Sequence, residues 1–291
     1  MAGRRGAWVI GGVFAVGILL SLFVWMAGGL GKGGGFISGA RRVGLVEIEG
    51  PIRSSASAIR QIKRYAADRS IAAVVVRIDS PGGEVGASQE IYAEVLRLRR
   101  EGNKKVVASL GGVAASGGYY VAVAADTIVA NPGTLTGSIG VILELYNVEG
   151  LLRKLGLDFT VVKSGKFKDI GSPVRPMLPE ERAVFQGVAD DTYGQFVDAV
   201  AGGRRLSREA VLKFADGRVF TGRQAQGLGL VDLLGSYEDA IAVAGEMSGL
   251  GRHPDTVKAG LPGRWETLFD RLDSELSTLF LRRISVRYSI Q

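Results

Sequence analysis

The spacing of hydrophobic and polar positions changes several times after residue 42, and each change predicts a new element. Residues 43–49 alternate apolar and polar side chains, which is typical of a strand with one covered face. Residues 54–68 carry apolar side chains at helical spacing. Residues 71–78 are almost continuously apolar and β-branched, as expected for a strand buried on both faces. A strand, a helix and a buried strand in succession predict a right-handed parallel crossover, and therefore an α/β fold.

The same reasoning continues to residue 247 and predicts further helices and strands. The predicted helices are 87–100, 119–125, 147–155, 179–200, 207–214, 222–227 and 237–247. The predicted strands are 105–110, 127–130 and 159–162. In parallel α/β sheets the functional loops gather at the carboxyl ends of the strands, so the loops after residues 78 and 110 are the first places to look for a site.

The N-terminal segment has a different pattern, since residues 6–31 contain no charged side chain. About 20 apolar residues are enough to span a bilayer as a helix, and Trp8 and Trp25 lie near the two ends of the segment, where interfacial aromatics are expected. A cleaved signal peptide is the competing interpretation, but its apolar region is normally about 7 to 15 residues long. We therefore expect a single transmembrane anchor that contacts the bilayer through residues 7–28, followed by a glycine-rich tether.

Charge says little about orientation or partners. The chain has a net charge of +7, but its basic residues are spread out and mixed with acids, so we expect no nucleic-acid partner. The basic residues that flank the predicted anchor are nearly balanced, with Arg4 and Arg5 before it and Lys32, Arg41 and Arg42 after it. We expect the N-terminus inside and the folded domain on the extracytoplasmic side of the cell inner or plasma membrane.

The absence of cysteine and the near absence of histidine restrict the chemistry. The chain has no cysteine, which excludes a disulfide, a thiolate nucleophile and a cysteine metal site. Its single histidine, His253, lies in a loop-like stretch and is expected at the surface. A zinc site or a relay that needs several histidines is therefore excluded.

One glycine-rich stretch, residues 111–120, encloses a lone serine, Ser116. It follows a predicted strand and precedes a predicted helix, so Ser116 is expected near a helix N-terminus, where developing negative charge is favoured. A second glycine loop, residues 79–85, leaves the neighbouring strand and would face the first. One interpretation is that both loops serve only for packing. The other is that together they form a site for acyl transfer, which needs a nucleophile and backbone N–H groups.

A serine nucleophile needs a base, and lysine is the simplest candidate when histidine is nearly absent. Lys163, Lys166 and Lys168 lie together after a predicted strand, and their spacing does not select one of them. A lysine with an ordinary pKa near 10.4 is protonated at neutral pH, and burial lowers this value. The base is therefore expected under cover in the assembled site.

Several motifs in order resemble the signal peptide peptidase A family of membrane-anchored Ser–Lys peptidases. The resemblance covers roughly residues 43–245. It is carried by Asp79-Ser80-Pro81-Gly82-Gly83, Ala115-Ser116-Gly117-Gly118-Tyr119-Tyr120, Thr136-Gly137-Ser138-Ile139-Gly140, Ser164-Gly165 with Lys168-Asp169 and Ser172-Pro173, Asp216-Gly217-Arg218-Val219 and Gly222-Arg223-Gln224-Ala225.

The resemblance implies a fold of the Clp protease and crotonase type, and it assigns a role to five residues. Ser116 would be the nucleophile and Lys168 the general base. Ser138 would position the lysine, and Gly83 and Gly117 would donate the N–H groups of the oxyanion hole. It implies no cofactor and no metal. It also implies a homo-oligomeric ring, with an octamer as one candidate size, that degrades released signal peptides or other apolar peptides.

The resemblance also divides the chain. The expected parts are an N-terminal stub and anchor (1–31), a tether (32–42), a peptidase domain (43–248) and a C-terminal extension (249–291) with an amphipathic helix at 265–281. Two other functions stay open. A crotonase-type acyl-CoA enzyme would share the glycine-loop chemistry without needing Lys168, and a non-catalytic membrane-assembly scaffold would use the glycine loops only for packing.

Overall fold

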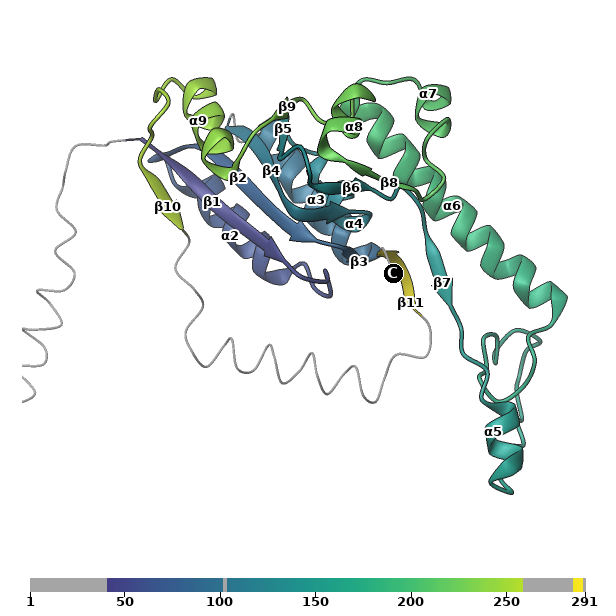
Figure 1. The fold of residues 1–291 in the computed structure, drawn as a ribbon. Coiled ribbons are helices and arrows are strands. Elements are labelled where there is room, and N and C mark those ends of the chain that lie inside the picture. Colours follow the sequence, from purple (N-terminus) through teal and green to yellow (C-terminus); the bar gives the residue numbers. More distant parts are fainter. Residues whose placement is uncertain (1–40, 102–103, 259–284, 290–291) are drawn as a thin grey trace, which may run out of the picture. The chain divides into compact units, whose positions relative to one another are not determined.

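A parallel sheet forms the centre of the folded part of the chain (Figure 1). The computed structural model describes residues 41–101, 104–258 and 285–289. Four strands, β1 (Arg42–Glu49), β2 (Ile71–Ser80), β4 (Lys105–Ala115) and β5 (Thr127–Ala130), lie side by side and are all parallel. Adding the edge strands gives the order β10-β1-β2-β4-β5-β9. The predicted α/β class with a parallel sheet is confirmed.

The remaining elements connect or extend this sheet. The helices are α2 (Ala56–Ala67), α3 (Val85–Glu101), α4 (Gly117–Ala122), α5 (Glu149–Lys154), α6 (Pro179–Arg204), α7 (Arg208–Leu212), α8 (Gly222–Gly227) and α9 (Tyr237–Met247). The other strands are β3 (Gly82–Glu84), β6 (Leu135–Gly137), β7 (Ile142–Glu144), β8 (Val219–Thr221), β9 (Leu233–Leu234), β10 (Thr256–Lys258) and β11 (Ser285–Ser289).

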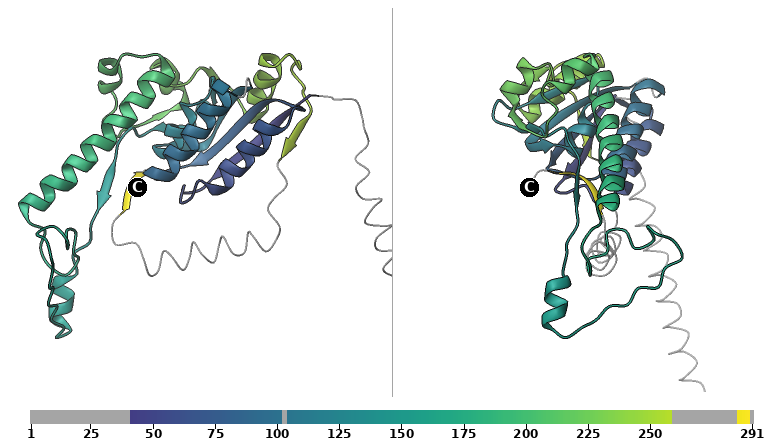
Figure 2. Two further views of the ribbon diagram at one scale, coloured as in Figure 1. Left: turned by 180° about the vertical axis from the view of Figure 1, so that it is seen from behind. Right: turned by 90° about the vertical axis from the view of Figure 1, so that its right-hand side faces the viewer.

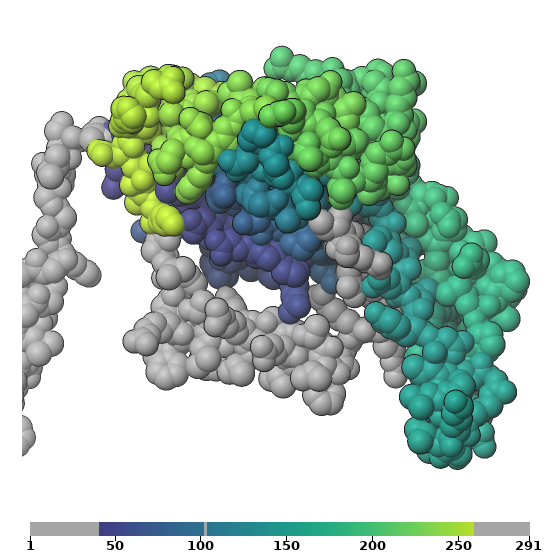
Figure 3. All heavy atoms as spheres, viewed as in Figure 1, coloured from purple at the N-terminus to yellow at the C-terminus, as the bar shows by residue number. Residues whose placement is uncertain are grey.

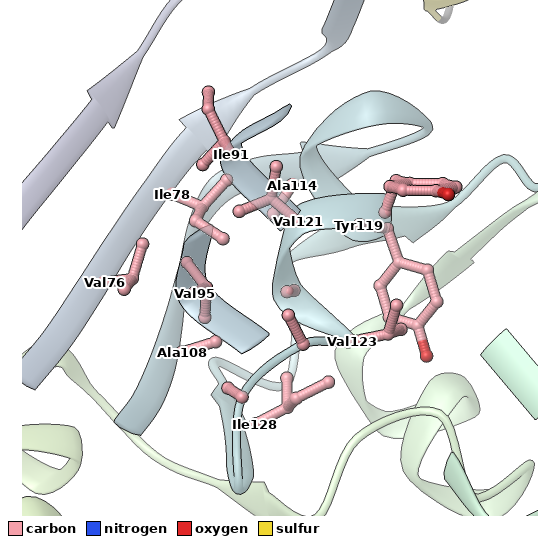
Figure 4. Close-up of a cluster of buried hydrophobic side chains, with 14 of the residues drawn as sticks. Val76, Ile78, Ile91, Val95, Ala108, Ala114, Tyr119, Val121, Val123 and Ile128 are labelled. Atoms are coloured by element: carbon pink, nitrogen blue, oxygen red, sulfur yellow. The ribbon is translucent and has the colours of Figure 1, made fainter. Parts of the chain in front are cut away.

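Successive side chains of β2 point into two different hydrophobic clusters, because side chains alternate between the faces of a sheet. Val74, Val76 and Ile78 join the larger cluster, whereas Ala73 and Val75 join the smaller one. The larger cluster contains apolar side chains of α2, α3, α4 and α6, and part of it is drawn in Figure 4. The smaller cluster is closed by α9. Helices therefore cover both faces of the sheet, which explains why the first six residues of β2, Ile71–Val76, are all apolar and buried.

A second, three-stranded sheet lies beside the carboxyl end of β2. Its order is β3-β11-β7, and both pairings are antiparallel. Tyr288 of β11 lies opposite Gly83, and Arg287 lies opposite both Glu84 and Ile142. The C-terminal strand is thus the central strand of this small sheet. In Figure 1 it lies next to β3, and both views in Figure 2 agree.

Residues 145–178, here called the arm, extend away from the main sheet (Figures 1 and 2). They contain α5 and otherwise no helix or strand. The strand predicted at 159–162 is therefore wrong: these residues are exposed and have no neighbouring strand in the described part of the chain, with Val162 96% and Phe159 63% exposed. An apolar run predicts a strand only where a sheet is available to receive it.

Most other predicted helices and strands are found within a few residues of the expected bounds. His253 is exposed in a loop, as expected. The predicted anchor, tether and terminal amphipathic helix lie outside the described residues, apart from residues 41 and 42. Among the residues that the structure does describe, no helix is both long and apolar enough to cross a membrane.

Candidate active site

Ser116 occupies a sharp turn between a strand and a helix. Strand β4 ends at Ala115 and α4 begins at Gly117, so Ser116 is the residue that changes direction. Its φ angle is 52° and its ψ angle −118°. A positive φ is costly for a residue with a side chain, of the order of 1–3 kcal/mol, and such strain is typical of functional turns. A serine nucleophile on a strained strand-to-helix turn has this same geometry in other hydrolases.

The side chain of Ser116 is buried, and none of the described residues forms a hydrogen bond with it. The residue is 1% exposed, and its Oγ bonds to no other atom among the described residues. The backbone around it is fully engaged: the Ser116 N–H donates to the Gly137 carbonyl at 2.8 Å, and the Tyr120 N–H donates to the Ser116 carbonyl at 2.8 Å. A buried hydroxyl without a partner costs free energy, so this one is a candidate for a functional role.

The loop at residues 79–84 lies against this turn, as the two glycine stretches predicted. A Cβ atom on Gly118 would lie only 2.9 Å from the Ser80 carbonyl oxygen, so the backbones are too close for a side chain. The buried Ser80 hydroxyl accepts a hydrogen bond from the Gly82 N–H at 3.1 Å. A Cβ on Gly83 would lie 2.1 Å from the Ile52 carbonyl oxygen. These contacts fix the path of the loop beside Ser116.

Two backbone N–H groups near the turn are candidates for oxyanion donors. The Gly117 N–H opens α4 and donates to no other backbone carbonyl in the described residues. On β3, the Gly82 carbonyl and the Glu84 N–H both bond to Ile52, at 2.8 Å each. Since successive backbone groups of a strand point to opposite sides, the N–H of Gly83 points away from Ile52 and towards β11.

Ser138 lies close to Ser116 in the topology of the sheet. Strands β4 and β6 are parallel neighbours in which Ala115 lies opposite Gly137, and each serine directly follows the last residue of its strand. Ser138 is buried, also has a positive φ, of 50°, and donates its N–H to the Arg218 carbonyl at 2.9 Å. It lines a pocket of about 940 Å³ between β7, α6 and residues 215–219.

Lys168 lies on the arm, within a run of turns between residues 165 and 172, and its side chain is exposed. The two other lysines of the cluster are engaged: Lys163 pairs with Asp169 at 2.5 Å, and Lys166 pairs with Glu180 at 2.7 Å. In the described residues the Lys168 ammonium group has neither an ion-pair nor a hydrogen-bond partner. The contacts therefore distinguish Lys168 from its neighbours, which the spacing could not do.

A network of charges next to Lys168 ties the arm to the start of α6. Arg175 donates through Nε to Asp169 Oδ2 at 2.9 Å and through Nη1 to Glu181 Oε2 at 2.8 Å. Glu181 also accepts from the Leu178 N–H at 2.9 Å. Hydrogen bonds from Arg175 are the main cause that lowers the pKa of Asp169, to which Lys163 adds, and that lowers the pKa of Glu181 to about 2. No motif in the sequence predicted this network; its only signal there is the acidic start of the helix, at residues 180 and 181.

One chain therefore brings together four of the five expected site residues. Ser116, Ser138, Gly83 and Gly117 lie on neighbouring strands and turns at the carboxyl edge of the sheet. Lys168 lies on the exposed arm, and none of the described residues provides the cover that was expected over the base. Figure 3 shows the arm, in teal, beyond the body that carries the other four residues.

A parallel sheet with a strained, buried serine at its carboxyl edge is an architecture of α/β hydrolytic enzymes. The family model for peptidase family S49 matches residues 98–251, more than half of the chain. The chain therefore belongs to peptidase family S49, and the resemblance to the signal peptide peptidase A family is confirmed.

Relatives with names agree with this membership. The chain is 47% identical to a "Putative protease" of Synechocystis sp. over 243 residues, which cover 82% of this chain and 86% of that protein. It is 41% identical to "Protease 4" of Salmonella typhi over 65% of this chain but only 30% of that protein. It is 38% identical to "Serine protease SPPA, chloroplastic" of Arabidopsis thaliana, over 68% of this chain and 30% of that protein. A serine protease is the function that the family supports.

Proposed function

We propose that this chain is a membrane-anchored serine endopeptidase that degrades released signal peptides or other apolar peptides with a Ser116–Lys168 dyad. The observation that carries the proposal is the buried Ser116 Oγ, which has no hydrogen-bond partner in the described residues and lies at a strained turn. Such strain and an unused buried hydroxyl both cost stability, and a nucleophile gives a reason for retaining them.

In the proposed reaction Ser116 Oγ attacks the carbonyl carbon of the substrate while a neutral lysine amine takes its proton. The N–H groups of Gly83 and Gly117 stabilise the oxyanion, an interaction that typically contributes about 3–4 kcal/mol per donor. The lysine then protonates the leaving amine and activates the water that hydrolyses the acyl-enzyme. Ser138 positions the lysine. No step needs a metal or a cofactor.

The proposed dyad is completed between two copies of the chain. Lys168 lies on the arm, which extends away from the residues around Ser116 of its own chain (Figure 1). The arm also exposes apolar side chains that water disfavours, including Tyr146 at 75% and Val162 at 96%. Such a surface is typical of an interface. Docked on a neighbouring copy, the arm would cover Lys168, and cover is what a lysine base needs to lose its proton.

This arrangement repeats head to tail, because each copy gives an arm to one neighbour and receives an arm from another. A head-to-tail interface with a closing rotation generates a ring. We therefore propose a homo-oligomeric ring whose size the interface geometry would set. The anchor at residues 7–28 would hold this ring at the membrane, with the peptidase domains on the extracytoplasmic side.

The proposed substrate class follows from the proposed location at the membrane. A relative from Enterococcus faecium, 39% identical over 63% of this chain and 53% of that protein, is named "Putative signal peptide peptidase SppA". A cleaved signal peptide is an apolar segment left in the membrane, and a peptidase anchored beside it is well placed to meet it.

The test uses the full chain in detergent or lipid, with a fluorogenic apolar peptide as substrate. Ser116→Ala and Lys168→Met should each lower kcat by about a thousandfold or more, since each removes one member of a catalytic pair. Lys166→Met is the matched control, because it removes a charge from the same arm and should leave kcat within about twofold. Near wild-type turnover in a folded Ser116→Ala chain would sink the proposal.

A further inference from the structure

Strand β4 bulges shortly before it delivers the chain to Ser116. The pairings with β2 on either side of the bulge are Ile78 with Leu110 and Ser80 with Ala114. Asp79 therefore stands alone opposite three residues of β4, 111–113. At the same place β4 exchanges its second neighbour, β5, for β6. Bulges occur often next to active sites, where they re-aim a side chain, so this one could set the direction of the nucleophile.

The side chain of Asp79 fits into this bulge. Its Oδ1 accepts a hydrogen bond from the Val113 N–H at 3.1 Å, and this is the only hydrogen bond that the side chain makes within the described residues. A Cβ atom on Gly111 would lie 2.6 Å from the carboxyl carbon of Asp79. The carboxyl group thus occupies the space that a side chain at position 111 would need. A carboxylate binds an N–H more strongly than a neutral acceptor does.

Two buried threonines hold the other edge of the same segment. Thr134 donates through Oγ1 to the Gly111 carbonyl, and Thr136 donates through Oγ1 to the Ala114 carbonyl, both at 2.7 Å. Thr136 belongs to β6 and Thr134 directly precedes that strand. Side chains from β2 on one side, and from β6 and its approach on the other, therefore bind the backbone of the bulge (Figure 1).

The strained turn at Ser116 explains why such contacts are needed. A residue stays in a costly backbone conformation only where the surrounding structure over-determines it. After the turn the chain is fixed by α4, in which Gly118 packs on the Ser80 carbonyl. Before the turn β4 pairs with β6 through only three residues, 113–115. The side-chain contacts at the bulge add the constraint that this short ladder lacks.

We propose that Asp79 is a positioning residue of the peptidase: its carboxylate holds the bulge of β4, and thereby the strained turn that aims Ser116 Oγ at the substrate. Thr134 supports the same segment from the other side. Asp79 acts through Val113 and not on the reacting atoms. The inference rests on the proposed function, because the aim of Ser116 matters only if this residue attacks a substrate.

The test compares two aspartates that bind the same strand in the same way. Asp126 Oδ2 accepts from the Val106 N–H at 2.9 Å, near the start of β4, whereas Asp79 binds near its end. Asp79→Ala and Asp126→Ala each remove one hydrogen bond between a carboxylate and the backbone. Each should lower the midpoint of thermal unfolding of the full chain by about 2–4 °C.

Only one of the two substitutions should affect catalysis. Asp79→Ala should lower kcat for the fluorogenic peptide about ten- to a hundredfold, because a small displacement of a nucleophile is enough for such a loss. Asp126→Ala is the matched control and should leave kcat within about twofold. KM should stay within about twofold in both chains, since neither aspartate is proposed to bind the substrate.

Two further variants distinguish a positioning contact from a contact with the substrate. Asp79→Asn keeps an oxygen that can accept the Val113 N–H, so it should retain kcat within about threefold of the wild type. Thr134→Val removes the hydroxyl on the other side of the bulge and should lower kcat about tenfold. This variant also tests the bulge if Asp79→Ala fails to fold. A residue that bound the substrate would instead raise KM, and Asp79→Asn would not restore it.

A crystal structure of the full Asp79→Ala chain gives a readout that needs no activity. The φ angle of Ser116, 52° in the strained turn, should leave the left-handed region once the bulge is released. In the Asp126→Ala chain this angle should stay unchanged.

The outcomes separate this inference from the function on which it rests. Wild-type kcat in a folded Asp79→Ala chain, an equal loss of kcat in Asp126→Ala, or an unchanged turn at Ser116 would overturn the inference and leave the peptidase standing. If the wild-type chain cleaves no peptide, the proposed function fails. The crystal structures then decide by themselves whether Asp79 holds the turn.

Discussion

The body around Ser116 and the arm around Lys168 are built in opposite ways. The body buries its apolar side chains between a parallel sheet and helices on both faces, and Ser116 itself is 1% exposed. The arm has one short helix, exposes its apolar side chains and is tied down mainly by charges at its base. Packing orders the first region, whereas the second is ordered by the contacts of Arg175.

This difference indicates how the site is assembled. The proposed nucleophile Ser116 and the proposed oxyanion donors are all positioned by strand pairings and turns of one chain. The proposed base, Lys168, lies on an exposed surface of the arm. A site divided in this way would be active only after copies meet, which would limit proteolysis to the assembled ring. The following predictions test this division, beginning with the largest expected effect.

Mixing two inactive variants should restore activity. Ser116→Ala and Lys168→Met chains should each be inactive alone by about a thousandfold or more. When the two are coexpressed, random assembly pairs an intact serine with a neighbour's intact lysine in about a quarter of the interfaces. Turnover of the mixture should therefore return to about a quarter of the wild-type rate.

The control for this experiment is a mixture of the separately purified, preassembled variants, which should stay inactive until subunits exchange. An inactive coexpressed mixture, with both chains present in one assembly by mass, would mean that the dyad forms within a single chain.

Within the body, a methyl group at Gly83 should damage both stability and activity. The added Cβ would lie 2.1 Å from the Ile52 carbonyl oxygen, so Gly83→Ala must shift β3. Overpacking of this kind costs about 1–3 kcal/mol, and kcat should fall about a hundredfold, as expected when an oxyanion donor is displaced. Thermal unfolding and peptide turnover measure the two effects.

Gly86→Ala is the matched control, since a Cβ there meets no atom within 4 Å and the residue lies in α3. It should stabilise the chain by about 0.5–1 kcal/mol, because alanine is the better helix former, and should leave kcat unchanged. If Gly83→Ala and Gly86→Ala had equal effects on stability and on kcat, the close approach of Gly83 to Ile52 would not be needed.

The arm should loosen in acid before the body unfolds. The pKa values of Asp169 and Glu181 are lowered by Arg175, so their contacts contribute fully above the ordinary carboxyl pKa of about 4. This contribution to stability is lost as the pH falls through the pKa values that the two carboxyl groups have in the folded chain; the pKa of Glu181 is about 2. Because the chain has no cysteine, a dye on a single Ser164→Cys can report arm mobility by its anisotropy between pH 6 and pH 2.

At neutral pH, Arg175→Ala should already show the low dye anisotropy of a mobile arm that the wild type shows only in acid. Its kcat should fall about tenfold, because Lys168 is less well positioned. Arg182→Ala removes a nearby charge from the exposed face of α6 and is the control. It should change neither the anisotropy of the dye on the arm nor kcat. An arm that keeps the same anisotropy in all three chains would show that the network does not order it.

Local patterns in the sequence determined the α/β class, most of the helices and strands, and Ser116 as a candidate nucleophile. These depend on periodicity, on glycines at turns and on the near absence of histidine, all of which can be found in neighbouring residues. Ordered motifs were also sufficient for the family. They assigned Lys168 a role, but nothing local distinguished it from Lys163 and Lys166.

Tertiary structure alone decided the rest, because it depends on pairings between residues far apart in the chain. The run at 159–162 predicted a strand and is exposed, since the described residues place no sheet beside it. Lys166 pairs with Glu180 because the arm lies against the start of α6, whereas Lys163 pairs with Asp169 because the arm turns back on itself between these two residues. Strand β11 lies about 200 residues from β3 in sequence, and no local pattern places Tyr288 opposite Gly83.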